Sequence, residues 1–186
     1  MIGYAICGSF CSFSASVLTL RELVKTGEQV LPIISERAYS TDTRFYASSE
    51  FVRDVEAICG QKAVHSIVEA EPLGPKKPLD ALIICPCTGN TLAKISRGIT
   101  DSSVTMAAKA HLRCDRPLLI ALATNDALSQ NLENIARLLT RKSVYFVPMR
   151  QDDPMGKPHS LVADFSRVSE ALLAMREQRQ LRPLFQ

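Results

Sequence analysis

The chain has 186 residues, of which 46% are hydrophobic and 22% charged, a balance that is typical of a globular protein and excludes a disordered one. This length predicts one domain with a single sizeable core. The net charge of +3 is spread along the sequence without a basic stripe, so we expect no nucleic-acid binding. No apolar run approaches the roughly 20 residues that cross a bilayer, and no basic segment precedes the apolar start, so we expect a cytoplasmic protein without a membrane segment.

The first elements alternate between strand and helix. An apolar run at 2–7 ends at Gly8 and predicts a buried strand. Apolar residues at helical spacing follow at 14–26, where Gly27 predicts a left-handed helix end, and a second apolar run lies at 29–34. A strand, a helix and a strand at this spacing form a βαβ unit, whose strands run parallel.

The same alternation continues to the end of the chain. In order, we predict a polar loop at 35–48, a helix at 49–59, a short strand at 63–68, an irregular segment with three prolines at 71–78, a strand at 79–85, helices at 91–97 and 103–112, a strand at 117–123, a helix at 128–140 and a last strand at 144–147. We therefore expect an α/β fold: a single domain over 1–186 with a doubly wound, Rossmann-like parallel sheet of about six strands. Residues 149–160 are a candidate active-site loop, and 161–186 form a C-terminal helix and tail.

Ligands of doubly wound sheets bind beyond the carboxyl ends of the strands, which directs attention to the turns at these ends. The first turn, Gly8-Ser9, lacks the Gly-x-Gly-x-x-Gly pattern of dinucleotide sites, but its backbone amides and hydroxyls suit a single phosphate. A plain helix cap explains the same serine, and Ser35 after the second strand is equally open to both interpretations.

The turn after the strand at 79–85 is the most informative one. We expect Pro86 to end the strand, Gly89 to allow close approach of a ligand, and Thr88 and Asn90 to supply hydrogen-bond donors at a helix start. A planar heterocycle rich in acceptors would suit this turn, and a simple threonine cap is the alternative. Farther along, Asn125-Asp126 is open to a catalytic role or to a cap of the next helix.

The six cysteines indicate reduced thiols, because nothing in the sequence points to export. Cys7, Cys11, Cys85 and Cys87 approach one another if the first and fourth predicted strands are neighbours. Their spacing does not match a zinc knuckle, so we predict no metal site. A redox pair is a further alternative, but cysteines in strands are more commonly small core residues.

The turn sequence Pro86-Cys87-Thr88-Gly89-Asn90-Thr91-Leu92-Ala93-Lys94 resembles the Pro-x-Ser-x-Asn-Thr-Leu-Ala-Lys pattern of the flavoprotein superfamily. This superfamily includes flavin prenyltransferases and flavin-containing cysteine decarboxylases. The continuation at 98–101, the Gly8-Ser9 turn and Ser35 also fit. The resemblance implies FMN or a related ligand, and a homo-oligomer with the flavin near a subunit boundary.

Segments at 40–45, 66–76, 124–128, 151–154 and 157–158 resemble one branch of this superfamily, the flavoprotein-type subunits of a two-subunit oxidoreductase of spore formation. The resemblance implies a partner subunit that is similar to dehydrogenases and carries NAD(P), a small dicarboxylate substrate, and the mother-cell cytoplasm. The decarboxylases carry a Pro-x-Met-Asn-x-x-Met signature after the fifth strand, and of this signature the present sequence keeps only Asn125. The prenyltransferases have an Arg-Glu pair where this sequence has Thr124-Asn125. They also use an arginine at the position that corresponds to Met106 here.

Together with the need to neutralise a dicarboxylate, the resemblance leads us to hypothesise three roles, and for each cation a solvated surface position is the alternative. The cofactor-binding residues would be Gly8, Ser9, Ser35, Thr88, Gly89, Asn90 and Thr91; the catalytic residues Asn125 and Asp126; and the substrate-binding cations Arg44, Lys94, Arg113 and Lys157. Three hypotheses follow. The chain contributes residues or flavin to an oxidoreductase, or it has lost the flavin and serves as a binding or scaffolding subunit, or it is an independent flavin-dependent decarboxylase or prenyltransferase.

Overall fold

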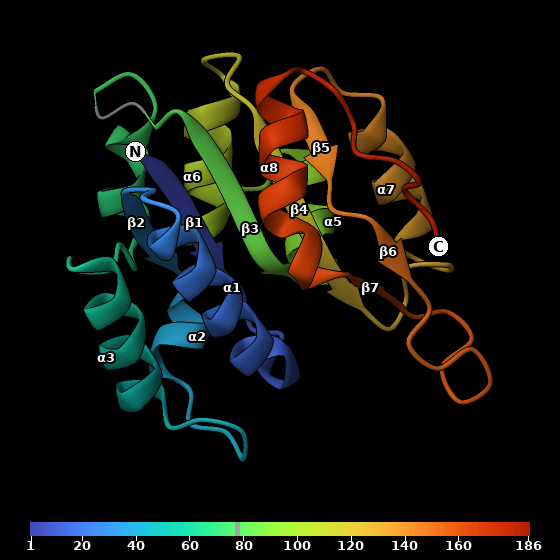
Figure 1. The fold of residues 1–186 in the computed structure, drawn as a ribbon, viewed down its shortest axis with the longest axis horizontal. Coiled ribbons are helices and arrows are strands. Elements are labelled where there is room, and N and C mark those ends of the chain that lie inside the picture. Colours follow the sequence, from blue (N-terminus) through green and yellow to red (C-terminus); the bar gives the residue numbers. More distant parts are fainter. Residues whose placement is uncertain (77–78) are drawn as a thin grey trace.

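A computed structural model describes residues 1–76 and 79–186, and these build one α/β domain around a central sheet (Figure 1). Within this part of the chain the sheet has seven strands in the order β2-β1-β3-β4-β7-β6, and β5 also pairs with β4. The strands are β1 (Ile2–Ile6), β2 (Val30–Ile34), β3 (Ala81–Cys87), β4 (Leu118–Thr124), β5 (Val144–Phe146), β6 (Met149–Arg150) and β7 (Leu161–Ala163). The expected doubly wound fold is confirmed.

Helices cover both faces of this sheet. They are α1 (Phe13–Lys25), α2 (Glu36–Ser40), α3 (Ser48–Cys59), α4 (Ile67–Ala70), α5 (Gly89–Arg97), α6 (Ser103–Leu112), α7 (Leu132–Leu139) and α8 (Val168–Arg176). In Figure 1, α1 and α8 lie in front of the sheet, whereas α5 and α6 lie behind it. The predicted helices at 14–26, 49–59, 91–97 and 103–112 agree with the observed bounds to within two residues.

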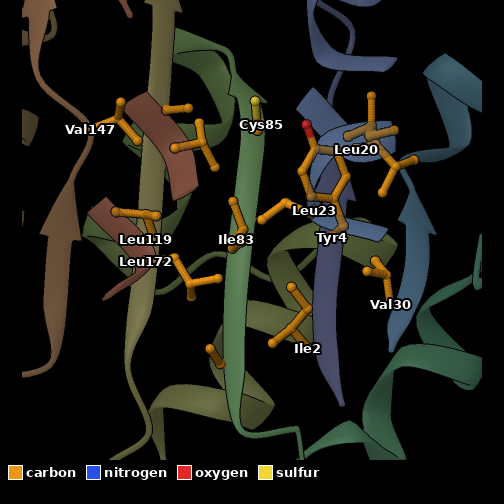
Figure 2. Close-up of a cluster of buried hydrophobic side chains, with 14 of the residues drawn as sticks. Ile2, Tyr4, Leu20, Leu23, Val30, Ile83, Cys85, Leu119, Val147 and Leu172 are labelled. Carbon is orange, nitrogen blue, oxygen red and sulfur yellow. The ribbon is translucent and has the colours of Figure 1, made fainter. Parts of the chain in front are cut away.

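The core follows the alternation of side chains along the strands. In β1, Ile2, Tyr4 and Ile6 point to the face that α1 and α8 cover, and Ala5 points to the face of α5 and α6. Figure 2 shows the first of these clusters, in which strand residues meet side chains of α1 and α8. The Tyr4 hydroxyl is buried and donates to the Ser16 carbonyl oxygen at 2.9 Å, so the one polar atom of this side chain is satisfied inside the core.

Pro86 does not end its strand, contrary to our expectation. β3 continues through Pro86 to Cys87, and its pairing with β4 shifts register between Ile84 and Cys87. A proline has no amide hydrogen to donate, and a position where the ladder is already interrupted tolerates that loss. The irregularity therefore moves the end of the strand two residues beyond the predicted one.

Three predictions for the middle of the chain need correction. The polar loop at 35–48 contains α2, which Ser35 caps by accepting from the Ala38 amide. The strand at 63–68 is reduced to one bridge between Val64 and Ile33, and α4 occupies its second half. The segment at 71–78 begins with a turn of 3-10 helix at Glu71–Leu73, and its residues 77–78 lie outside the described part.

The C-terminal part also differs from the prediction. β5 is not the last strand, because β7 pairs antiparallel with the end of β4 and β6 pairs antiparallel with β7. β5 and β7 thus share one edge of β4. The helix predicted at 128–140 begins only at Leu132, after a turn. In the described ranges, no helix is both long and apolar enough to traverse a lipid bilayer.

Candidate functional site

A cavity of about 660 Å³ lies beyond the carboxyl ends of β1, β2 and β3. The chain passes from β1 to β2 on one side and later adds β3 on the other, so the strand order reverses here. The lining residues are Cys7, Gly8, Phe10, Ser35, Glu36, Arg37, Thr41, Thr88, Asn90, Thr91, Lys94, Asp101 and Ser102. A larger cavity of about 990 Å³ lies at the opposite end of the sheet, where it contains none of the predicted site residues.

The first turn of α5 forms one wall of the cavity. Thr88 caps this helix by accepting from the Thr91 amide at 3.2 Å, and its hydroxyl donates to the Thr91 hydroxyl at 3.0 Å. Asn90 has an exposed side chain at the cavity rim. The cap that we considered as an alternative is therefore present, and it directs the amino end of α5 toward the cavity.

The opposite wall comes from the turn after β2. The Glu36 carboxylate accepts from the Ser103 amide at 3.0 and 3.1 Å, and the Ser103 hydroxyl donates to the Ile34 carbonyl oxygen at 2.8 Å. Glu36 thereby joins the end of β2 to the start of α6, 67 residues away. This junction holds Ser35 in the cavity wall.

Two cations and two carboxylates border the cavity. The Lys94 ammonium lies 2.8 Å from Asp101, which lowers the pKa of that carboxyl, so this pair is internally neutral. The Glu36 carboxylate is occupied by the start of α6. Arg37 forms no ion pair with any described residue, and it is therefore the cation best placed to attract an anionic ligand.

Two buried thiols lie below the cavity. Cys7 and Cys87 are 1% and 0% exposed, and both belong to the cluster that faces α5. The neighbouring Cys87 side chain, together with Thr91 and Thr88, outweighs burial and lowers the pKa of Cys7. The Cys87 thiol itself donates to the Thr88 carbonyl oxygen at 3.6 Å. Burial raises the pKa of Cys87, and it raises that of Cys85, on the other face of β3, to about 12.

A second, shallower hollow of about 450 Å³ lies on the other side of α5. Here the Asp126 carboxylate accepts from the Thr124 hydroxyl and from the Asn131 side-chain amide at 2.9 Å. Gly89 packs against these groups, because a Cβ atom at this position would lie 2.5 Å from Thr124 Oγ1 and from Asn131 Nδ2. Asn90 borders both hollows, so it links the two halves of the predicted site.

The structure brings only part of the predicted site together. The first cavity is lined by six of the predicted residues: Gly8, Ser35, Thr88, Asn90, Thr91 and Lys94. The second is lined by Gly89, Asn90 and Asp126. Ser9 follows Gly8, and its hydroxyl lies 3.2 Å from that of Ser12. Asn125 is exposed and lies in the lining of neither cavity.

The other three predicted cations lie elsewhere in the chain. The Arg44 guanidinium stacks 4.7 Å from the centre of the Phe45 ring on an exposed loop. Arg113 follows the last residue of α6, about 15 Å along the helix from the cavity, and pairs with Glu71 at 3.6 Å. Lys157 pairs with Asp152 at 2.9 Å inside the loop between β6 and β7. Their roles toward a substrate stay predictions.

Glu36 and Arg37 were not among the predicted site residues. Both belong to α2, in the segment for which we expected a polar loop. A serine followed by five residues without proline or glycine was the local signal for a short capped helix. Nothing in the sequence indicates that Glu36 caps α6, because the two groups lie far apart along the chain.

The doubly wound sheet with a cavity at its switch point is typical of α/β proteins that bind a ligand at the carboxyl ends of their strands. The chain belongs to the Flavoprotein family, whose model matches residues 1–172. The B-type subunit of dipicolinate synthase from Bacillus subtilis is 42% identical to it over 183 residues, 98% of this chain and 92% of that protein.

Solved structures agree with this assignment. The crystal structure of the B-type subunit of dipicolinate synthase from Bacillus halodurans superposes with a TM-score of 0.91 at 39% identity, covering 100% of this chain and 95% of that one. A dodecameric FMN-dependent UbiX-like decarboxylase from Escherichia coli O157:H7 is more distant, with a TM-score of 0.63, 26% identity and 80% coverage of both chains. The resemblance inferred from the turns is thereby confirmed.

Proposed function

We propose that this chain is the flavoprotein-type subunit of a dipicolinate synthase. In this proposal it acts with the other, A-type subunit of the synthase, a dehydrogenase-like protein that carries NAD(P), to oxidise a dihydrodipicolinate-type intermediate to dipicolinate in the mother-cell cytoplasm of a sporulating bacterium. The observation that carries the proposal is the 42% identity to the Bacillus subtilis protein over 98% of the chain. The segments at 151–154 and 157–158, which carry part of the resemblance, lie in a loop, and packing alone does not dictate the identity of loop residues.

The first cavity fits the phosphate end of FMN. Its volume of about 660 Å³ falls in the usual range of ligand pockets. Ser35 and the amino end of α5 supply neutral donors, and the nearby acids Glu36 and Asp101 are already paired. Within residues 1–76 and 79–186, the Ser35 hydroxyl accepts from the Ala38 amide and donates to no group, so its hydrogen can donate to a phosphate oxygen.

In the proposed site FMN would supply a two-electron acceptor, and the chain would bind and orient it. Gly8, Ser9, Ser35 and Arg37 would hold the phosphate, while Thr88, Asn90 and Thr91 would face the ring. The dicarboxylate would require cations; with Arg37 on the phosphate, the other cation at the cavity is Lys94, which would have to exchange Asp101 for the substrate. Arg44, Arg113 and Lys157 would contribute only through a rearranged loop or another subunit.

We also propose a homo-oligomer. The dodecameric relative from Escherichia coli supports this part of the proposal. Light scattering after gel filtration measures the mass directly. A 20.5 kDa particle at micromolar concentration would contradict it.

Titration of the purified chain with FMN, followed by absorbance and by flavin fluorescence, tests the cofactor assignment. We expect Asn90→Ala to weaken binding about five- to tenfold, because one hydrogen bond to the ring is lost. Asn125→Ala is the matched control: it removes the same amide from an exposed position outside both cavities. Equal effects of the two changes would contradict the placement of the ring beside Asn90.

The reaction itself is tested by mixing the chain with the dehydrogenase-like subunit, NAD(P) and the dihydro intermediate. Dipicolinate should form only when both subunits are present. If the chain does not bind FMN but dipicolinate still forms only in its presence, the result supports the scaffolding hypothesis. Product formation by the dehydrogenase alone would contradict the proposed function.

A further inference from the structure

Cys7 and Cys87 lie side by side on neighbouring strands. β1 and β3 pair in register up to Ala5 and Ile84. The Cys7 amide then donates to the Pro86 carbonyl oxygen at 3.3 Å, and in a parallel ladder this bond sets Cys7 beside the residue after Pro86, which is Cys87. Beyond the pair of Ala5 and Ile84, the two residues Ile6 and Cys7 therefore run alongside the three residues 85–87. The extra residue turns Cys87 to the face that Cys7 occupies.

The spacing suits a disulfide. Neighbouring strands lie about 4.8 Å apart, within the range of about 4.4–6.8 Å between Cα atoms that a disulfide spans. Both residues are free thiols in the structure. Cys85 belongs to the same strand but points to the opposite face, where it packs in the other core cluster.

The two thiols differ in their surroundings. Cys7 is 1% exposed but belongs to the lining of the 660 Å³ cavity, whereas Cys87 is 0% exposed and does not. The neighbouring Cys87, Thr91 and Thr88 favour the Cys7 thiolate and lower its pKa, whereas burial disfavours the thiolate of Cys87. A thiolate in the wall of a cavity, beside a protonated thiol, is the arrangement of an attacking and a resolving cysteine.

We propose that Cys7 and Cys87 form a redox-active dithiol, which a hydroperoxide oxidises to a disulfide at the base of the cavity. The Cys7 thiolate attacks the peroxide O–O bond, and the product is a sulfenic acid and, with hydrogen peroxide, one water. The Cys87 sulfur then attacks the Cys7 sulfur, the S–O bond breaks and a second water leaves. The two thiols lose two electrons and two protons in total, and the peroxide gains them.

The proposal does not depend on the proposed synthase function, since it needs only the cavity and the two cysteines. Its test uses the full chain, reduced, freed of reductant and treated with hydrogen peroxide. Free thiols counted after denaturation should fall from six to four. Non-reducing tryptic digestion should link peptide 1–21 to peptide 77–94 with the loss of two hydrogen atoms.

Each of these peptides contains two cysteines, so a double variant assigns the bond. Cys11→Ser with Cys85→Ala leaves one cysteine in each peptide, and its thiol count should fall from four to two. Cys87→Ala should abolish the link and leave Cys7 oxidised without a partner. If the link in the wild-type chain passes through Cys11 or Cys85, or if all six thiols survive excess peroxide, the proposal is wrong.

Discussion

Gly89 shows how closely the residues of the candidate site are packed. The Thr124 hydroxyl and the Asn131 side-chain amide both donate to the Asp126 carboxylate, and the Gly89 backbone packs against these groups. Asn134 extends this network by donating to Asn131 at 3.0 Å. The Asp126 carboxylate is therefore already engaged in positioning the turn after β4. It does not cap the next helix, the structural alternative that the sequence offered, because α7 begins after Asn131.

We predict that Gly89→Ala destabilises the chain by about 1–3 kcal/mol, because the added methyl group would overlap the Asp126 network. Helix propensity alone would make alanine more stable than glycine at this first position of α5. A lower free energy of unfolding therefore indicates steric overlap, and a higher one indicates helix propensity. The free energy of urea unfolding gives the measurement.

Gly8→Ala is the control for this prediction. Its Cβ atom would lie 3.4 Å from the Phe10 ring, an ordinary contact, so we expect a change within about 0.5 kcal/mol. If Gly89→Ala is as stable as the wild type, the side chains around Gly89 can move to make room for the methyl group, and the prediction is wrong.

At the scale of elements, the junction between β2 and α6 shapes the cavity. Ser102 and Thr105 form a capping box at the start of α6, and Glu36 from α2 adds a carboxylate to the Ser103 amide. The helix start is thus satisfied from both its own segment and a distant one. Ser35 and Arg37 flank Glu36 in the cavity wall. Loss of the contact between Glu36 and the Ser103 amide would therefore also free these two residues to move.

Glu36→Ala should lower the free energy of unfolding by about 0.5–2 kcal/mol, the usual effect of losing a cap. Glu50→Ala is the matched control, since Glu50 is an exposed acid in the first turn of α3. Urea unfolding of both variants measures the difference. Equal stabilities of the two would contradict a capping role for Glu36.

At the scale of the whole molecule, one buried histidine links stability to pH. His111 is 0% exposed, its Nε2 lies 2.9 Å from the Pro117 carbonyl oxygen, and its Nδ1 contacts no polar partner among residues 1–76 and 79–186. Burial lowers the pKa of His111 below its usual 6.5. The unfolded chain therefore binds a proton at a higher pH than the folded chain does.

The stability that the neutral ring contributes is present above pH 6.5 and is lost as the pH falls from 6.5 toward the folded-state pKa. The loss is at most about 1.4 kcal/mol per pH unit in that window. We expect His111→Leu to be less stable at pH 7.5 but to lose less stability than the wild type on going to pH 5.5. His159→Gln, an exposed control, should keep the wild-type dependence; an unchanged slope in His111→Leu would contradict the assignment.

The sequence by itself determined the alternation of strands and helices, the βαβ start and the bounds of four helices, α1, α3, α5 and α6. It also offered the Thr88 cap of α5 as one of two interpretations of that turn, and the structure shows the cap. These features depend on apolar periodicity and capping groups a few residues apart, so they can be read without knowing which strands become neighbours.

Only the tertiary structure decided how distant segments meet. The register shift that sets Cys87 beside Cys7, the antiparallel pairing of β7 with β4, and the contact of Glu36 with α6 each join groups that are far apart along the chain. The separation of Arg113 from the cavity has the same origin, because the length and direction of α6 carry it away. Such placements follow from lateral packing and strand register, which no local sequence pattern specifies.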